Sequence, residues 1–436
     1  MLPIYLVVLF LANGNLARYN LIDQSVDSFE DASGVDADTS TGEYRDSSGK
    51  YYSGTLVGSA TYTVFNTTPG GGTWTVPAGV TSVEALVVAG GGAGGWMYGG
   101  GGGAGGIVHH TTFAVTPGAD VTVTVGAGGA GMNSNAQATS GGDSVFSTMT
   151  ATGGGGGGNS ALAGNDGGSG GGGGMIDGSD GSGGSAGQPA VSGATVYATA
   201  GGNGEGAPDY TGGGGGGAAA AGSNSNGNAA GPGGAGKLFS NFTSYGASSG
   251  YFGGGGGGTY NSAYASSVGA GGIGGGASGR EIAGGTAYSG SANTGGGGGA
   301  GGNSVSTYSG AGGSGFVGLL YTPLTYDNMT LVSTATTAEA APTKGDLVFT
   351  YTNGVGTAVV GTNITAEYSA DNGSTWTDFA IAAGDVQGTT GGHTIVTKNN
   401  VSLTSTSGTS MRYRIKTLVQ SASLSTRIHA VSLGWS

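Results

Sequence analysis

The chain has 436 residues, of which 106 are glycine, and its 24 acidic and 11 basic side chains give a formal net charge of −13. Ordinary proteins contain about 7% glycine, so the composition departs from that of a common globular protein. The absence of cysteine excludes disulfides, thiolate metal sites and thiol catalysis. The acidic balance argues against nucleic-acid binding, which depends on Lys and Arg neutralising phosphates.

The chain begins with a continuous apolar stretch over residues 1–12. This stretch is too short to span a bilayer, which needs about 20 apolar residues. It has the length of a signal-peptide core, and residues 12–17 could hold a cleavage site, but no basic residue precedes it. A cleaved signal and a retained segment therefore both stay open.

Residues 19–58 are polar and hold eight of the 24 acidic residues. A calcium loop starting at Asp36 would need glycine at its sixth position and glutamate at its twelfth. Glycine is instead the seventh residue of this stretch, and Ser47 is the twelfth. We therefore predict a solvated loop with turns, and we define residues 1–58 as an amino-terminal attachment or signal-like segment with an acidic loop.

Six segments around the glycine-rich region alternate apolar and polar residues between Gly and Pro punctuation, a pattern that predicts strands. They are residues 60–65, 73–77, 82–89, 106–115, 120–125 and 314–321. The fourth and fifth are expected to form a strand pair joined by the turn at residues 116–119. These segments predict a β framework that opens and closes a glycine-rich domain over residues 59–321.

Glycine runs of five or six residues recur through residues 90–313, with aromatic and aliphatic residues between them. A flexible linker is the simplest interpretation of Gly-rich sequence. The restricted run length and the intervening aromatics favour an ordered bundle of extended polyglycine II helices, in which the absence of Cβ lets backbones hydrogen-bond side by side. Because glycine loses much conformational freedom on folding, only a dense hydrogen-bond network could offset that cost.

Residues 322–436 contain far less glycine and six to eight short alternating segments, which predict a carboxy-terminal antiparallel β-sandwich or jelly-roll-like module. No amphipathic helix is evident. The predicted fold class is all-β plus non-regular structure: a β framework enclosing a polyglycine II helix bundle, followed by this β-sandwich.

The sequence shows no motif that is typical of a catalytic site. Residues 369–376 match the Asp-box pattern Ser-x-Asp-x-Gly-x-Thr-Trp, which here predicts a stable hairpin turn rather than a sialidase site. His393 and His429 are isolated in the sequence, and no phosphate loop has the required lysine. We predict no enzyme activity, no catalytic residues, no metal and no cofactor.

Aromatic residues between the glycine runs have the composition of a binding surface, in which Tyr and Trp stand among Gly, Ser and Asn. Packing at the ends of the bundle is the competing interpretation. The candidate receptor-binding residues are Trp96, Tyr98, Tyr210, Tyr245, Tyr251, Phe252, Tyr260, Tyr264 and Tyr288.

The stretches at residues 73–95, 100–108, 115–118, 121–129 and 310–317 resemble the glycine-rich domain of bacteriophage tail fibre and adhesin proteins. The resemblance covers roughly residues 60–321, and residues 427–435 are more weakly similar to terminal modules of phage fibres. It implies a virion attachment protein on the phage tail, whose loops recognise a host-surface glycan or outer-membrane protein and whose other partners are virion or fibre subunits. Whether the chain forms a homo-oligomer stays open.

An apolar first segment fits a phage fibre badly. If it is a true export signal, the alternative is a secreted bacterial cell-surface or filament-forming structural protein.

Overall fold

The computed structural model describes residues 18–21, 23–46, 51–67, 70–77, 79–160, 162–176, 179–261, 267–280, 285–302 and 307–436. The chain divides into two compact units. The β unit combines the described part of Met1–Ser59 with Pro323–Ser436, and the glycine-rich unit is Ala60–Thr322. In the chain, the glycine-rich unit is therefore an insertion within the β unit.

Both units are mostly β structure. Within the described ranges there is no α-helix, and two single-turn 3₁₀ helices, η1 (Ser240–Phe242) and η2 (Ala383–Asp385), interrupt the strands. No helix in that part of the chain is long and apolar enough to cross a membrane.

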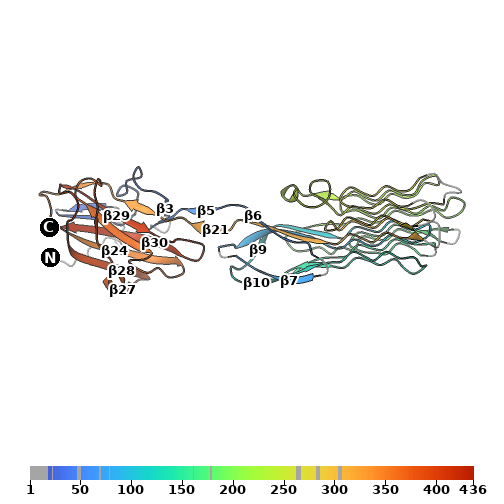
Figure 1. The fold of residues 1–436 in the computed structure, drawn as a ribbon, viewed down its shortest axis with the longest axis horizontal. Helices are drawn as coiled ribbons and strands as arrows, with labels where there is room; N and C mark the ends of the chain where they lie inside the picture. The colour runs from blue at the N-terminus through green and yellow to red at the C-terminus, as the bar shows by residue number, and fades with distance from the viewer. Residues whose placement is uncertain are drawn as a thin grey trace. The chain divides into compact units, whose positions relative to one another are not determined.

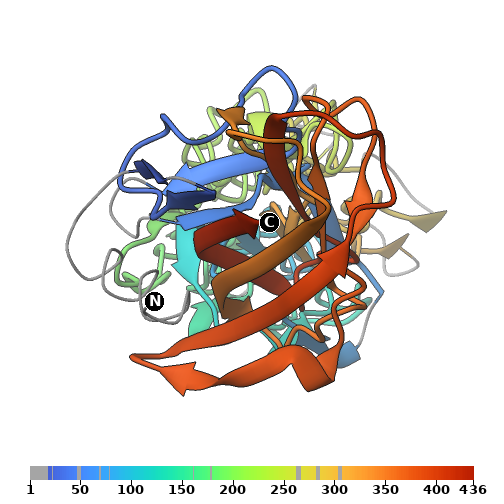
Figure 2. The ribbon, with the colours of Figure 1, turned by 90° about the vertical axis from the view of Figure 1, so that its left-hand side faces the viewer.

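The β unit contains two antiparallel sheets (Figures 1 and 2). The larger has the order β1-β2-β30-β24-β28-β27, and β4 joins it by pairing with both β30 and β3. Its strands are β1 (Arg18–Leu21), β2 (Gln24–Asp27), β3 (Glu43–Asp46), β4 (Tyr51–Gly54), β24 (Lys344–Val355), β27 (Val386–Thr390), β28 (His393–Ser402) and β30 (Ser425–Trp435).

The smaller sheet has the order β22-β29-β25-β26, with β23 also paired to β29. Its strands are β22 (Thr330–Val332), β23 (Thr336–Thr337), β25 (Ile364–Ser369), β26 (Thr377–Asp378) and β29 (Ser410–Thr417). A separate two-stranded ribbon pairs β5 (Leu56–Gly58) with β21 (Leu324–Tyr326), on either side of the insertion in the chain.

One hydrophobic core joins the two sheets of the β unit, because its buried residues come from strands of both. Phe349 of β24 and Tyr368 of β25 are both fully buried members of it. Strand β29 shows why the sequence folds this way: its side chains alternate between buried and half-buried over the whole strand, with Tyr413 inside and Arg414 outside. A period of two places one side of the strand against the core and the other toward solvent.

The turns predicted for the acidic loop are present at residues 37–39, but the residues on either side of this loop form strands that the sequence does not predict. Strand β2 pairs with β30, so that Asp27 lies opposite Val431, and β4 also pairs with β30. Phe29 and Tyr52 belong to the core of the β unit, with ring centroids 5.0 Å apart. The sequence does not indicate these strands because they are short and lack apolar alternation, and because their partner strand lies at the far end of the sequence.

The framework of the glycine-rich unit consists of two antiparallel sheets with the orders β15-β9-β8-β20-β6 and β12-β11-β10-β7. The first contains β6 (Thr61–Phe65), β8 (Ser82–Val88), β9 (Ile107–Ala114), β15 (Thr195–Tyr197) and β20 (Phe316–Tyr321). The second contains β7 (Gly70–Thr75), β10 (Asp120–Val125), β11 (Ser144–Phe146) and β12 (Met149–Ala151).

Three further strand pairs lie along the glycine-rich unit. They are β13 (Met175–Ile176) with β14 (Ser179–Asp180), β16 (Lys237–Leu238) with β17 (Tyr251–Phe252), and the parallel pair β18 (Gly285–Thr286) with β19 (Thr307–Tyr308).

Strands β9 and β10 correct one expectation, because they do not pair with each other. Strand β9 pairs with β8 and β15, whereas β10 pairs with β7 and β11. Val108 of β9 and Val123 of β10 nevertheless share a hydrophobic core. The turn between the two strands therefore connects two sheets around one core instead of closing a hairpin.

The glycine-rich segments run side by side away from the framework strands to turns at the opposite end of this unit (Figure 1). Their backbone hydrogen bonds repeat every three residues. The amides of residues 100, 103 and 106 donate to residues 158, 155 and 152, those of 101 and 104 to residues 213 and 216, and those of 102 and 105 to residues 298 and 295. The segment over residues 100–106 thus donates to three neighbours in turn. Its carbonyls accept hydrogen bonds from the amides of residues 89, 92, 95, 169, 172 and 256.

Candidate functional site

The turn Trp96–Tyr98 lies farthest from the framework along its part of the chain. Strand β8 ends at Val88 and β9 begins at Ile107, and the chain reverses direction between them. A hydrogen bond from the Gly95 amide to the Gly100 carbonyl, at 2.8 Å, closes this turn. The sequence places an aromatic pair at this turn. Trp96 is buried with 7% of its surface exposed, and Tyr98 is half-buried.

Two other segments meet this turn. The rings of Tyr98 and Tyr210 have centroids 6.2 Å apart, and the Asn261 amide donates to the Tyr210 carbonyl at 3.1 Å. Tyr260 forms an isolated bridge with Thr211 and is 3% exposed. The structure therefore brings together four of the predicted residues, which we call the tip cluster: Trp96, Tyr98, Tyr210 and Tyr260.

The tip cluster contains unusual backbone geometry. Tyr98 and Tyr210 have φ angles of 55° and 51°, and Met97 has a φ of 42°. Positive φ is uncommon outside glycine for a bulky side chain, and such strain concentrates at functional sites. The hydrogen-bonded glycine segments, which we call the glycine lattice, adjoin both turns: Gly95 and Gly99 flank the first, and Gly212 follows the second.

Two acidic residues, Asp180 and Glu205, are hydrogen-bonded to the turn that contains Tyr210, and the Glu205 backbone pairs with Thr211. The Gly206 amide donates to Asp180 Oδ1 at 3.1 Å, and one buried oxygen of Glu205, Oε2, accepts no hydrogen bond within the described residues. Hydroxyl, carboxylate and aromatic groups are the chemistry that recognises sugar hydroxyls or polar protein surfaces. No group of three or more His, Cys, Asp or Glu side chains that could hold a metal ion is found in the described ranges.

Three predicted residues lie at the other end of the glycine-rich unit, and two of them, Tyr245 and Phe252, pack against the framework. Phe252 is fully buried, with its ring 5.1 Å from that of Phe316 in β20. The Tyr245 ring lies 5.5 Å from the Phe316 ring, and Tyr251 is half-buried in β17. A fully buried ring has no surface to offer a partner, so we assign Phe252 to packing.

The remaining two predicted residues belong to neither group. Tyr288 is 65% exposed, and its carbonyl accepts a hydrogen bond from the Gly299 amide at 3.0 Å. Tyr264 lies outside the described residues.

The Asp box forms the predicted hairpin turn, between β25 and β26 of the β unit. Ser369 Oγ donates to Asp371 Oδ1 at 2.7 Å, and Thr375 Oγ1 donates to Asp371 Oδ2 at 2.6 Å. Burial opposes ionisation of Asp371, but these hydrogen bonds outweigh it and lower its pKa to about 2. All of these contacts join residues of the turn to one another and so stabilise the turn.

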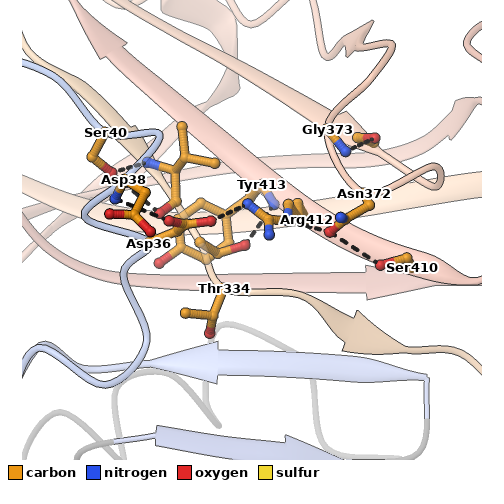
Figure 3. A network of polar contacts seen from close by, with 12 residues as sticks. Asp36, Asp38, Ser40, Thr334, Asn372, Gly373, Ser410, Arg412 and Tyr413 are labelled. Atoms are coloured by element: carbon orange, nitrogen blue, oxygen red, sulfur yellow. Dashed lines mark hydrogen bonds and ion pairs between the residues drawn. The ribbon is translucent and has the colours of Figure 1, made fainter.

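The turn is tied to the amino-terminal stretch through Arg412 of β29 (Figure 3). The guanidinium forms an ion pair with Asp36, while its Nε donates to Asn372 Oδ1 at 2.8 Å. The hydrogen bond from Arg412 lowers the pKa of Asp36. The Asp36 carboxylate, which the calcium-loop interpretation would have needed, is thus engaged by an arginine.

Two histidines that are isolated in the sequence meet in the β unit. The His393 and His429 rings have centroids 4.1 Å apart, and His429 Nε2 lies 2.8 Å from Thr352 Oγ1. Burial is the main cause that lowers the pKa of His429 to about 4, with His393 and Arg427 adding to it, and burial also lowers the pKa of His393. His393 lies on β28 and His429 on β30, and these strands flank β24 in the sheet. Because the two histidines meet only through this strand pairing, their spacing in the sequence does not predict their contact.

Acid should weaken the β unit through His429. Its folded pKa lies below the ordinary value of 6.5, so the unfolded chain binds more protons and stability falls as pH drops from 6.5 toward 4. We expect the free energy of unfolding to fall by about 1–2 kcal/mol between pH 7 and pH 5. Denaturant unfolding at both pH values measures this.

His429→Gln removes the titration while keeping a polar group near Thr352, and it should reduce that pH dependence. His110→Gln, in the glycine-rich unit, is the matched control and should leave the unfolding of the β unit unchanged. An undiminished pH dependence in His429→Gln would contradict the assignment.

The fold defines a class of all-β protein with a glycine-rich unit inserted in its chain. The model of the glycine-rich domain family matches residues 65–322, more than half of the chain. The chain belongs to this family. A search of curated proteins found no match.

Proposed function

We propose that this chain is a receptor-binding structural protein of a virion, a phage tail fibre or adhesin, that recognises a host-surface glycan or outer-membrane protein. The tip cluster is the proposed contact surface, and other fibre subunits are the proposed structural partners. The observation that carries the proposal is the pair of strained tyrosines, Tyr98 and Tyr210, held on adjacent turns by the glycine lattice. The resemblance of the glycine-rich segments to phage adhesins supports it.

The scaffold is proposed to be a bundle of polyglycine II helices. Such a helix has three residues per turn and no internal hydrogen bonds, so each turn presents amides in three directions. The three-residue period of the hydrogen bonds around residues 100–106 supports this assignment. A backbone bonded on every side is rigid, which lowers the entropy lost when the turns bind a partner.

Binding of the full chain to bacterial cells and to immobilised bacterial surface glycans tests the proposal. Tyr98→Asn combined with Tyr210→Asn removes both rings while retaining a residue that tolerates positive φ. We expect the affinity for the bound cell or glycan to fall at least about tenfold, because aromatic anchors dominate interfaces.

Leu238→Asn is the matched control, since Leu238 is 42% exposed at the framework end of the same unit. It should bind like the native chain. The proposal fails if the native chain binds no bacterial surface, or if the double variant unfolds like the native protein and binds equally well.

A further inference from the structure

The β unit contains a hollow that the proposed function does not use. Its volume is about 390 Å³, and its lining comes from β3, β4 and β30 together with the β5–β21 ribbon. Three tyrosines and one arginine dominate the lining: Tyr44, Tyr51, Tyr326 and Arg427. Tyr44 is 54% exposed, so an aromatic ring is available at the mouth of the hollow.

Arg427 supplies a positive charge that the protein leaves without a carboxylate partner among the described residues. Its guanidinium lies 4.9 Å from the centre of the Tyr51 ring. The nearby carboxylate, Asp46, instead accepts a hydrogen bond from the Tyr51 hydroxyl at 2.9 Å. By contrast, Arg412 and Arg414 on β29 both form ion pairs with carboxylates.

Ser425 adds an unsatisfied hydroxyl to the same hollow. It is 1% exposed, and its Oγ has no hydrogen-bond partner in the described part of the chain. A Cβ placed on Gly354 would lie 2.4 Å from Ser425 Oγ and 3.2 Å from Arg427 Nε, so both groups pack directly against this glycine and leave no space beside it. The Ser425 hydroxyl is therefore enclosed by the protein, and a buried hydroxyl without a partner lowers the stability of the fold.

These groups select one class of ligand. A guanidinium binds a carboxylate with two parallel hydrogen bonds, and tyrosine rings pack against the apolar face of a sugar while their hydroxyls meet its polar edge. We infer that the hollow binds a carboxylated sugar residue, with the carboxylate on Arg427 and the sugar ring against the tyrosines. This inference does not depend on the tip cluster, which belongs to the other unit.

Calorimetric titration of the full chain tests it, with a galacturonic acid trimer as the probe and a galactose trimer as the neutral match. We expect saturable binding of the acidic trimer, at least about tenfold weaker binding of the neutral one, and loss of affinity as salt is raised.

Two substitutions distinguish recognition from folding. Arg427→Lys retains the charge but loses the planar fork, so affinity for the acidic trimer should fall about tenfold. Ser425→Ala should leave the affinity unchanged and the melting temperature unchanged or higher, because it removes an unpartnered hydroxyl that is enclosed by the protein. Arg414→Lys is the matched control, since Arg414 also lies over an aromatic ring, 4.2 Å from the Trp376 centroid.

Equal affinity for the two trimers, or unchanged affinity in Arg427→Lys, would overturn the inference. So would binding of a peptide carboxylate without binding of the acidic trimer. The Tyr98/Tyr210 double variant should bind the acidic trimer normally, so failure of the tip-cluster proposal remains distinguishable from failure of this one.

Discussion

Gly102→Ala should destabilise the glycine-rich unit by about 3 kcal/mol, because the surrounding backbone leaves no space for a methyl group. A Cβ on Gly102 would lie 2.1 Å from the Gly92 carbonyl oxygen and 2.7 Å from its carbon. Neither atom can rotate away, since the Gly92 backbone is itself hydrogen-bonded to Gly103. The neighbouring segments would have to separate, and each separation breaks hydrogen bonds that no water replaces.

Thermal unfolding and limited proteolysis of the full chain measure this effect. Gly72→Ala is the matched control, because a Cβ on Gly72 of β7 meets nothing within 4 Å. Fully buried alanines such as Ala93 and Ala104 show that a methyl fits at selected positions. Equal stability of Gly102→Ala and Gly72→Ala would show that the backbone is packed less tightly than these distances indicate.

The sequence predicted some features of the glycine-rich unit but not the pairing of its segments. Runs of constant length with aromatics between them indicated order, and the framework segments at residues 82–89 and 314–321 contain β8 and β20. Glycine has no side chain to specify a partner, however, so nothing in the runs indicates which segment bonds to which. The partition of β9 and β10 between two sheets was hidden for a related reason: alternation predicts a strand but not its neighbour.

The candidate sites were likewise predictable only in part. The sequence predicted Tyr98, Tyr210 and Phe252 alike as candidate binding residues, because all three stand between glycine runs. The rings of Tyr98 and Tyr210 do lie near each other, whereas Phe252 packs in a core with β20. Local composition cannot separate a ring at a far turn from one beside the framework, since both stand among glycines. The hollow around Arg427 was invisible in the sequence because its tyrosines come from β3, β4 and β21, which lie on both sides of the insertion.

Removing the glycine-rich unit should leave a β unit that folds, whereas residues 323–436 alone should not fold. The pairing of Gly58 with Leu324 brings the two ends of the insertion together. Replacing residues 59–323 by Asn-Gly would therefore close a two-residue hairpin between β5 and β21. Residues 323–436 alone lack β2 and β4, together with the core side chains of Phe29 and Tyr52.

Loss of a buried aromatic side chain costs about 3–5 kcal/mol, and a domain has only about 5–15 kcal/mol of stability in total. Near-ultraviolet circular dichroism and denaturant unfolding of the two chains compare the outcomes. The joined chain should unfold cooperatively, and its Tyr52→Ala variant should be weakened by several kcal/mol. Cooperative unfolding of residues 323–436 at the same denaturant concentration as the joined chain would show that the amino-terminal strands do not stabilise the sheet. The expected result instead makes residues 18–58 and 323–436 one folding unit, which the glycine-rich unit interrupts in the chain but does not complete.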